Sequence, residues 1–408
     1  MIRPIQSGSR EAVAALERLA RLPGRLCFPL DSATNRSEVA AVVRAGDEVA
    51  AGAVLAQGPA LVIHASLPGI VEQVDDRRLV LRHEGKSGMV SASTPKPPLP
   101  ENLPDFARDM GWVGMGGSLF PASIKLKAAQ RIHTLVVNAV ECEPGIEIDE
   151  ALLLHDAAAV RAGLSCLVDA LGGPKVVLAV KRSSVSRTAA FAAECNATVL
   201  AMPNRYPGGA EKLIIARLAG RLPPAGVLPM QWGYLAFSAA SLWALGRRLL
   251  HGEPSILRPL TLVLPGAPAR NLLVPVGTPI GHVVESYAPP VNPDTHFIVA
   301  GGLMMGRRAA PDDPVLKGTN AIFVRPVEER LTRAEAPCIL CGSCFDVCPL
   351  KLHPSGMADR IKDKLYSPAL AAQLGECFLC GACSAVCPSE IPLVQYFQRG
   401  KQWLRERT

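Results

Sequence analysis

Short apolar runs alternate with turn-forming residues in the early part of the chain, from residue 26 to residue 90. Turn signals stand at Ala45-Gly46-Asp47, at Ala51-Gly52 and at Leu67-Pro68-Gly69. Strand-length apolar runs separated in this way predict a small all-β unit. Residues 91–105 contain five prolines and predict a linker.

The pattern changes beyond the linker, where β-branched runs alternate with segments of helical spacing. This order predicts an α/β unit with a parallel sheet, whose ligands bind where the carboxyl ends of the strands meet. The apolar segment Tyr234 to Leu245 predicts a buried helix. The expected strands span 133–137, 175–180 and 198–202, and the expected helices span 149–171, 185–195 and 209–218.

Strand signals return between residues 257 and 325, separated by many glycines and prolines. The runs Leu260 to Leu264, Phe297 to Ala300 and Ile322 to Val324 suit a small β-grasp-like module. A basic tail, Gln398 to Thr408, ends the chain.

Composition narrows the class of protein. The 408 residues are 49% hydrophobic, 19% charged and 5% aromatic, with a net charge of +7. This mild charge and the scarcity of aromatics argue against nucleic acid as a partner. The N-terminus has no apolar core of the signal-peptide type, and no stretch reaches the ~18 apolar residues of a membrane span. We therefore expect a non-exported protein without a spanning helix.

Twelve cysteines in such a chain argue against disulfides. Cys27, Cys142, Cys166 and Cys195 are scattered and are expected to be packing residues. The other eight form a Cys-x2-Cys-x2-Cys-x3-Cys-Pro motif that recurs 39 residues later, the pattern of two 4Fe–4S clusters. Zinc also uses Cys-x2-Cys pairs, but it needs only four ligands and does not favour a third cysteine at this spacing.

The last cysteine of each such motif ordinarily binds the other cluster. The expected ligands are Cys338, Cys341, Cys344 and Cys387 for the first cluster, and Cys377, Cys380, Cys383 and Cys348 for the second. Two clusters carry single electrons, so a flavin that accepts a hydride would complete the chemistry.

Three segments offer a candidate cofactor site. The first is the glycine-rich run from Gly114 to Pro121, followed by Lys125, which suits a phosphate although glycine loops are common. The second, Asn138 to Pro144, follows the first predicted strand, and a solvated turn is its alternative. The third, Tyr206 to Lys212, follows the third strand and could be an ordinary helix entry.

The order of these segments resembles the flavin and nicotinamide site of the flavoprotein subunit of respiratory complex I. The run Val43 to Val71 also resembles the hammerhead domain of biotinyl and lipoyl carriers, without a lysine at the hairpin tip. With the β-grasp module, the doubled cysteine motif and the run Val299 to Gly306, the chain is similar to the RnfC family. RnfC is the peripheral subunit of the Rnf ion-translocating electron-transport complex.

The resemblance implies an FMN site, an NAD(H) site and hydride transfer to the flavin before electrons reach the clusters. It implies that FMN is bound by Gly114, Gly116, Gly117, Lys125, Asn138, Glu141, Tyr206 and Gly209. It implies that Phe120 stacks on the dinucleotide, with Glu143 and Glu211 near its polar groups.

The chain departs from the family at several of these positions. Ser118, Leu119 and Ala122 stand where family members have Ala, Gly and Thr, and Ser238 and Ser241 replace an asparagine and a threonine. Leucine adopts positive φ at a cost and adds bulk. Two alternatives therefore stay open: an iron–sulfur relay or scaffold without productive NADH binding, and a soluble flavin–iron–sulfur reductase of the cobalamin-reductase type.

The resemblance also implies partners and a location. The partners would be integral membrane Rnf subunits, an iron–sulfur Rnf subunit, NADH and, downstream, ferredoxin. The location would be the cytoplasmic side of the bacterial inner membrane, with peripheral attachment, and the basic tail suits either anionic headgroups or solvent. The expected fold is a multidomain α/β protein in four parts: an N-terminal segment with a barrel-sandwich hammerhead at 1–90, a Rossmann-like FMN/NADH domain at 91–256, a soluble-ligand-binding β-grasp module at 257–330, and a helical ferredoxin-like domain at 331–408.

Overall fold

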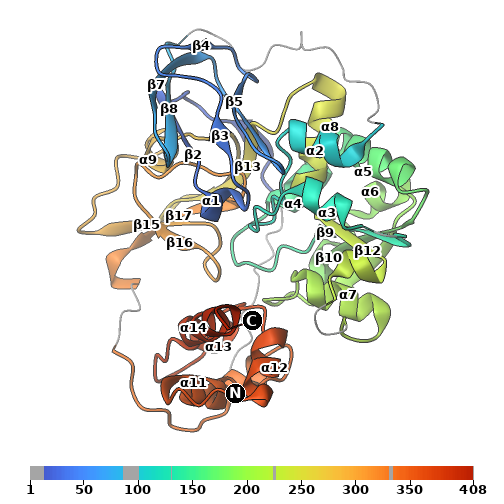
Figure 1. Cartoon of the computed structure of the whole chain (residues 1–408), viewed down its shortest axis with the longest axis vertical. Helices are drawn as coiled ribbons and strands as arrows, with labels where there is room; N and C mark the ends of the chain where they lie inside the picture. Colours follow the sequence, from blue (N-terminus) through green and yellow to red (C-terminus); the bar gives the residue numbers. More distant parts are fainter. Residues whose placement is uncertain (1–12, 86–100, 130, 224–226, 330–333, 408) are drawn as a thin grey trace.

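The computed structural model describes residues 13–85, 101–129, 131–223, 227–329 and 334–407. It is a mixed α/β protein with several sheets and a helical C-terminal part (Figure 1). In Figure 1 the N-terminal strands lie at the top, the α/β part at the right and the C-terminal helices at the bottom.

The N-terminal part contains the predicted strands, in two small sheets. One sheet has the order β2-β8-β7-β4, from Arg25–Pro29, Arg78–Arg82, Gly69–Val74 and Glu48–Val49. The other has the order β3-β5-β6, from Ala40–Ala41, Val54–Gln57 and Val62–His64. Alternate residues of these strands form an apolar core that includes Leu26, Phe28, Leu55, Leu79 and Leu81. A short helix, α1 (Ser32–Asn35), interrupts the strands.

The α/β part is built on the predicted parallel sheet, with the strand order β11-β10-β9-β12. These strands are β9 (Thr134–Ala139), β10 (Lys175–Lys181), β11 (Thr198–Met202) and β12 (Tyr234–Ser238). The helices are α2 (Leu103–Asp109), α3 (Ala122–Lys127), α4 (Ile148–His155), α5 (Ala157–Ala170), α6 (Ala189–Glu194), α7 (Glu211–Ala219) and α8 (Ala239–His251). The predicted linker, 91–105, overlaps the first three residues of α2, which begins at Leu103, and residues 86–100 lie outside the described residues.

Two sequence predictions in this part are wrong in detail. The expected helix 149–171 is broken at Asp156 into α4 and α5, which meet at 95°. The segment from Tyr234 to Leu245 is not one helix, because its first five residues form β12 beside β9. Gly233 in the left-handed region starts this strand, and the Ser238 side chain, which accepts from the Ser241 N–H, starts α8.

The third part is a six-stranded mixed sheet with the order β1-β14-β13-β17-β15-β16. Its strands are β1 (Leu16–Arg18), β13 (Leu257–Val263), β14 (Arg270–Pro275), β15 (His296–Ala300), β16 (Arg307–Ala309) and β17 (Ala321–Pro326), with helix α9 (Ile280–Glu285) packed on it. Strand β1 comes from the N-terminal segment but pairs with β14. The segment assigned to the first part in sequence thus contributes to the third part in space.

The C-terminal part consists of five short helices around a small apolar core of Met357, Leu374 and Phe397. The helices are α10 (Ser343–Val347), α11 (Pro354–Lys362), α12 (Pro368–Glu376), α13 (Ala382–Ala385) and α14 (Leu393–Arg405). Trp403 of the basic tail stacks on Tyr366 at 3.6 Å between ring centroids, so this ring packs against the protein. Within the described ranges, no single helix is long and apolar enough to cross a membrane, and only the bent pair α4 and α5 has that length and composition together.

Candidate functional site

Two adjoining cavities lie at the carboxyl end of the parallel sheet, where the loops were expected to hold a ligand. The first, of about 590 Å³, is lined by Gly114, Gly116, Phe120, Lys125, Asn138, Gly209 and Glu211 among the predicted residues. The second, of about 550 Å³, is lined by Gly116, Gly117, Glu143, Tyr206 and Gly209. Ten of the eleven predicted cofactor residues therefore line one cavity or both.

The glycine-rich run forms the wall that the cavities share. Its backbone turns sharply, because the Gly114 N–H donates to the Phe120 carbonyl at 2.8 Å. Gly116 and Gly117 are exposed, so their backbone is open to a ligand. The loop is held by one of its own residues, Met115, whose N–H donates to Ser241 Oγ at 2.9 Å. Ser241, one of the departures from the family, thus holds the loop in place.

Leu119 adopts the left-handed conformation that a glycine would adopt more easily, with φ at +54°. Its side chain packs against Gly318, where an added Cβ would come within 2.8 Å of Leu119 Cγ. The leucine is half-buried and lines the second cavity. The bulky side chain that the sequence places here therefore lies at the second cavity and narrows it.

Lys125 on α3 projects into the wall of the first cavity. Its Nζ lies 3.2 Å from Glu211 Oε2 and also donates to the Ala236 carbonyl. The same ammonium lies 5.1 Å from the centre of the Phe237 ring. The lysine is held by these neighbours at a place where it can meet an anionic group.

Asn138 and Gly209 join the end of β9 to the loop before α7. Asn138 Nδ2 donates to the Gly209 carbonyl at 3.0 Å, and Asn138 Oδ1 accepts the Val140 N–H at 3.1 Å. A Cβ at Gly209 would lie 2.1 Å from the Val140 carbonyl oxygen, so only glycine fits there. This contact brings two of the predicted segments to one wall of the first cavity.

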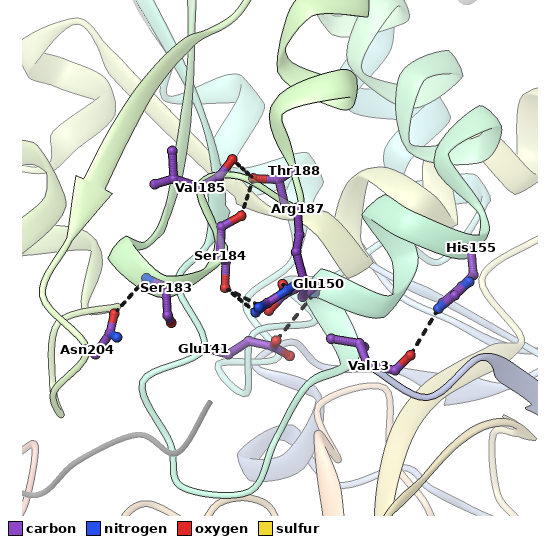
Figure 2. A network of polar contacts seen from close by, with 10 residues as sticks. All are labelled: Val13, Glu141, Glu150, His155, Ser183, Ser184, Val185, Arg187, Thr188 and Asn204. Atoms are coloured by element: carbon purple, nitrogen blue, oxygen red, sulfur yellow. Dashed lines mark hydrogen bonds and ion pairs between the residues drawn. The ribbon is translucent and has the colours of Figure 1, made fainter. Parts of the chain in front are cut away.

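Glu141 lies outside both cavities. Its carboxylate is buried, with 6% of the residue exposed, and accepts the N–H groups of Asp149 at 2.7 Å and of Glu150 at 3.3 Å. Burial, together with the nearby charge of Asp149, raises the pKa of Glu141 to about 8. Figure 2 shows Glu141 beside Glu150, whose carboxylate binds Ser184 and Arg187. Glu141 therefore caps α4 rather than facing a ligand in the cavities.

Glu143 lies in the second cavity, but its carboxylate is engaged by the protein itself. It accepts the N–H groups of Met304 and Met305, each at 2.9 Å. Burial raises the pKa of Glu143, while these two N–H groups lower it. The acid thus anchors the glycine-rich loop between β15 and β16, from Gly301 to Gly306.

The second cavity reaches the second cysteine motif, since Phe378 and Cys380 line it. The Tyr206 hydroxyl, inside the cavity, donates to the Cys380 carbonyl. Burial raises the pKa of Tyr206, and the charges of Glu143 and Cys380 add to this effect. The loops of the α/β part and the cysteine motif therefore form a single site.

The thiols expected to bind the second cluster lie close together. Burial raises the pKa of Cys380 to about 11, and the neighbouring charges of Cys377 and Cys348 raise it further. Burial likewise raises the pKa of Cys383 to about 12, with added effects from Cys380, Cys377 and Cys348. Four thiols that influence one another in this way suit a shared cluster, with Cys348 contributed by the first motif.

The thiols expected to bind the first cluster are more open. Cys338 and Cys341 are exposed, Cys344 and Cys387 are half-buried, and Cys341 Sγ lies 3.2 Å from Ser343 Oγ. In the described part of the chain, no three His, Cys, Asp or Glu side chains are grouped tightly enough to hold a single metal ion. Each thiolate of a 4Fe–4S cube binds a different iron, so its ligands stand farther apart than those of one ion.

Arg258 on β13 was missed by sequence reasoning. Its guanidinium is completely buried and donates to the carbonyls of Met115 and Lys317, each at 2.8 Å. Burial lowers the pKa of Arg258 to about 10, while the charges of Asp149 and Glu141 raise it. The signal for this residue was a single charged side chain in a largely apolar strand.

Comparison with known families adds to this geometry. Residues 107–247 match the Nuo51 FMN-binding domain, and residues 334–391 match the 4Fe-4S dicluster domain. These matches confirm the prediction of FMN and 4Fe–4S clusters as cofactors. The first match covers the glycine-rich wall and all the residues that line the first cavity, and the second match covers all eight motif cysteines. The fold and the site thus define a flavin- and iron–sulfur-binding electron-transfer protein.

Relatives narrow the class further. The chain is 33% identical, over 94% of its length, to the C subunit of the ion-translocating oxidoreductase complex of Edwardsiella ictaluri, of which it covers 51%. It is 28% identical, over 86% of its length, to the C subunit of the proton-translocating ferredoxin:NAD(+) oxidoreductase complex of Clostridium ljungdahlii, of which it covers 81%. These relatives confirm the predicted resemblance of the chain to this family of C subunits, the RnfC family.

The chain spans about half the length of the first curated relatives it matches. Its fold is also similar to a solved structure, an NAD+-reducing nickel–iron hydrogenase in the H2-reduced state, with a TM-score of 0.51 and 18% identity. That likeness covers 72% of this chain and 60% of the other.

Proposed function

We propose that this chain is the peripheral electron-input subunit of a Rnf-type membrane complex. It passes electrons between NAD(H), FMN and two 4Fe–4S clusters toward ferredoxin, and partner subunits couple this transfer to ion translocation. The observation that carries the proposal is the junction of the two cavities with the second cysteine motif, because Cys380 and Gly116 line the same cavity.

The residues of the first cavity fit FMN. Exposed glycine backbone at Gly116 lets a flat ring approach closely, and Lys125 offers a positive charge for the phosphate. Gly114, Asn138 and Gly209 of the first cavity complete the proposed FMN-binding set, together with Gly117 and Tyr206 from the adjoining second cavity. Glu141 acts only through the position of α4. Bound FMN would supply the exchange between a two-electron hydride donor and one-electron carriers.

NAD(H) is proposed for the space beside the flavin, with Phe120 as its stacking partner. Phe120 has 39% of its surface exposed, which suits a ring that meets a ligand. Glu211 lines the first cavity and Glu143 the second, although Lys125 and the Met304–Met305 backbone already engage their carboxylates. The two acids would therefore act on the dinucleotide indirectly, by positioning Lys125 and the Met304–Met305 backbone.

The remaining parts are proposed to serve docking. The N-terminal sheets would form a barrel-sandwich module, and the six-stranded sheet would form a β-grasp module. We place the parts at 1–90, 91–256, 257–330 and 331–408, with β1 as an N-terminal strand that reinforces the third part. We also propose attachment to integral Rnf subunits and an iron–sulfur Rnf subunit at the cytoplasmic side of the bacterial inner membrane. The names of the relatives support a place in a multi-subunit complex.

A second candidate function is an iron–sulfur relay without productive NADH binding. Leu119 favours it, since the side chain narrows the second cavity in a backbone conformation suited to glycine. In that case the clusters would be reduced by another subunit, and NADH would leave the protein unchanged.

Cofactor analysis of the anaerobically purified protein tests the proposal. We expect about eight irons per chain for two 4Fe–4S clusters, and one FMN that Cys341→Ala does not remove. The same substitution should reduce the iron content, because it deletes a ligand of the first cluster. A protein with both clusters but no affinity for FMN would support the relay instead.

A second experiment tests the place of the chain in a complex. Membranes depleted of this chain should lose NADH-linked ferredoxin turnover and regain it when the purified holoprotein is added. Full turnover in the depleted membranes would contradict the assignment as the electron-input subunit.

A further inference from the structure

The two cysteine motifs are equivalent in backbone conformation but not in surroundings. Leu340 and Leu379 have φ angles of 56° and 59°, and Gly342 and Gly381 have 77° and 80°. Each pair is separated by the same 39 residues as the cysteines. The duplication is therefore retained in the fold.

The difference between the motifs lies in their exposure. In the first motif, Ile339 is 66% exposed and Leu340 is 84% exposed. In the second motif, the matching Phe378 and Leu379 are half-buried. The first loop is open to solvent, whereas the second is covered.

Three contacts cover the second motif, and all fall within residues 376–381. The Tyr206 hydroxyl donates to the Cys380 carbonyl, and Lys212 Nζ forms an ion pair with Glu376 and donates to its carbonyl at 3.2 Å. The Met304 carbonyl oxygen lies 3.5 Å from the place where a Cβ on Gly381 would stand. The α/β part and the β15–β16 loop thus hold the same short segment from two sides.

Glu143 holds the β15–β16 loop, which contacts the motif from the second of these two sides. Its carboxylate binds the N–H groups of Met304 and Met305, and a Cβ on Gly302 would lie 2.0 Å from its Cδ. The carboxylate thus occupies the space that a side chain at residue 302 would need, and it holds the loop whose Met304 carbonyl lies near Gly381. Glu143 therefore acts on the cysteine motif through the methionine loop.

We propose that the two clusters lie at fixed and unequal distances from the flavin cavity. Tyr206 and Glu143 are the residues that set this arrangement, by holding the second cysteine motif. The cluster bound by Cys377, Cys380, Cys383 and Cys348 is the inner one, at the second cavity, which adjoins the flavin cavity. The cluster of the first motif is the outer one and exchanges electrons with an external one-electron carrier. One electron moves in each transfer between clusters, and no bond forms or breaks. The inference rests on the proposed function, since it orders the clusters relative to the flavin.

The first test is a redox titration of the cluster-loaded protein, followed by electron paramagnetic resonance. Hydrogen bonds and solvent exposure set cluster potentials. Tyr206→Phe should therefore shift the midpoint potential of one signal only, the one that Cys341→Ser retains. Binding of FMN to the flavin-depleted protein should shift that same signal. Tyr366→Phe, which changes a tyrosine stacked on Trp403, should shift neither.

The second test is hydrogen–deuterium exchange, which remains readable if a cysteine variant fails to fold. Exchange in residues 376–381 should rise in Tyr206→Phe and Glu143→Gln, while exchange in residues 338–343 should stay unchanged. Equal responses of both motifs, or a response of the first motif alone, would overturn the inference.

The two tests separate this inference from the proposed function. If FMN does not bind but residues 376–381 alone respond to Tyr206→Phe, the proposed function fails and the unequal docking of the motifs stands. If FMN binds and shifts the signal lost in Cys341→Ser, the proposed function stands and the cluster order is wrong.

Discussion

Arg258 is expected to be the residue on which the shape of the flavin site depends most. It is 0% exposed and makes four hydrogen bonds, from Nε to the Thr319 carbonyl, from Nη1 to the carbonyls of Met115 and Lys317, and from Nη2 to Asn320 Oδ1. In Arg258→Lys the donors stand on one atom and cannot reproduce the planar fork. At least two of the bonds are lost, and each hydrogen bond from a charged group contributes about 1.5 kcal/mol or more.

We therefore expect Arg258→Lys to lower the free energy of unfolding by about 3 kcal/mol, which corresponds to a loss of about 6–12 °C in the thermal midpoint of a cooperative unit of about 150–250 residues. FMN retention should weaken in parallel, because the Met115 carbonyl in the glycine-rich loop loses its partner. Differential scanning calorimetry and flavin release on gel filtration measure the two effects.

The matched control is Arg270→Lys on the neighbouring strand β14. Arg270 has 46% of its side chain exposed and pairs with Glu17 at 3.0 Å, a surface ion pair that contributes about 0–1 kcal/mol. A midpoint for Arg258→Lys within 2 °C, or about 1 kcal/mol, of this control would refute the role assigned to the buried guanidinium.

Three further predictions concern the cavities and the helix that supports them. Leu119→Gly should relieve about 1–2 kcal/mol of backbone strain and speed NADH-driven reduction in stopped-flow absorbance; Leu340→Gly, with a similar φ of 56° on the exposed first motif, should not, and equal rates would mean that Leu119 does not limit access. Lys125→Met should weaken FMN binding in equilibrium dialysis by removing the cavity-wall charge, whereas Lys127→Met on the exposed side of α3 should leave it unchanged. Glu141 binds a proton in the folded state up to about pH 8 that the unfolded state releases near its ordinary pKa of 4.5, so stability falls as pH rises between these values. Glu141→Gln should flatten the fall in thermal midpoint over that range, and an unchanged slope would show that another group causes it.

The parts of the fold that could be predicted are those with a local signal. The spacing of the cysteines indicates that they bind clusters. Strands β9, β10 and β11 were predicted from β-branched runs that alternate with segments of helical spacing. The positive φ of Leu119 could also be expected, since it stands where family members have glycine. Such features depend on a few neighbouring residues and can be predicted without knowledge of the rest of the chain.

The features that could not be predicted depend on distant contacts. The helix breaks between α4 and α5 at Asp156, whose Oδ2 accepts the indole N–H of Trp243 on α8 at 2.6 Å. Strand β1 joins the six-stranded sheet because Leu16 to Arg18 finds a parallel edge at β14. Glu141 was assigned to the flavin by the resemblance to the family, but Asp149 and Glu150 bring the start of α4 to its carboxylate. A motif identifies the residue types at a site, whereas tertiary packing decides which of them face the cavity.

The most direct test of the account is an anaerobic absorbance spectrum of the holoprotein, recorded before and after stoichiometric NADH. The account predicts that the flavin bands bleach together with the broad absorbance of the clusters, because the second cavity joins the flavin cavity to the second cysteine motif. Flavin and clusters that dithionite reduces but NADH leaves oxidised would contradict it.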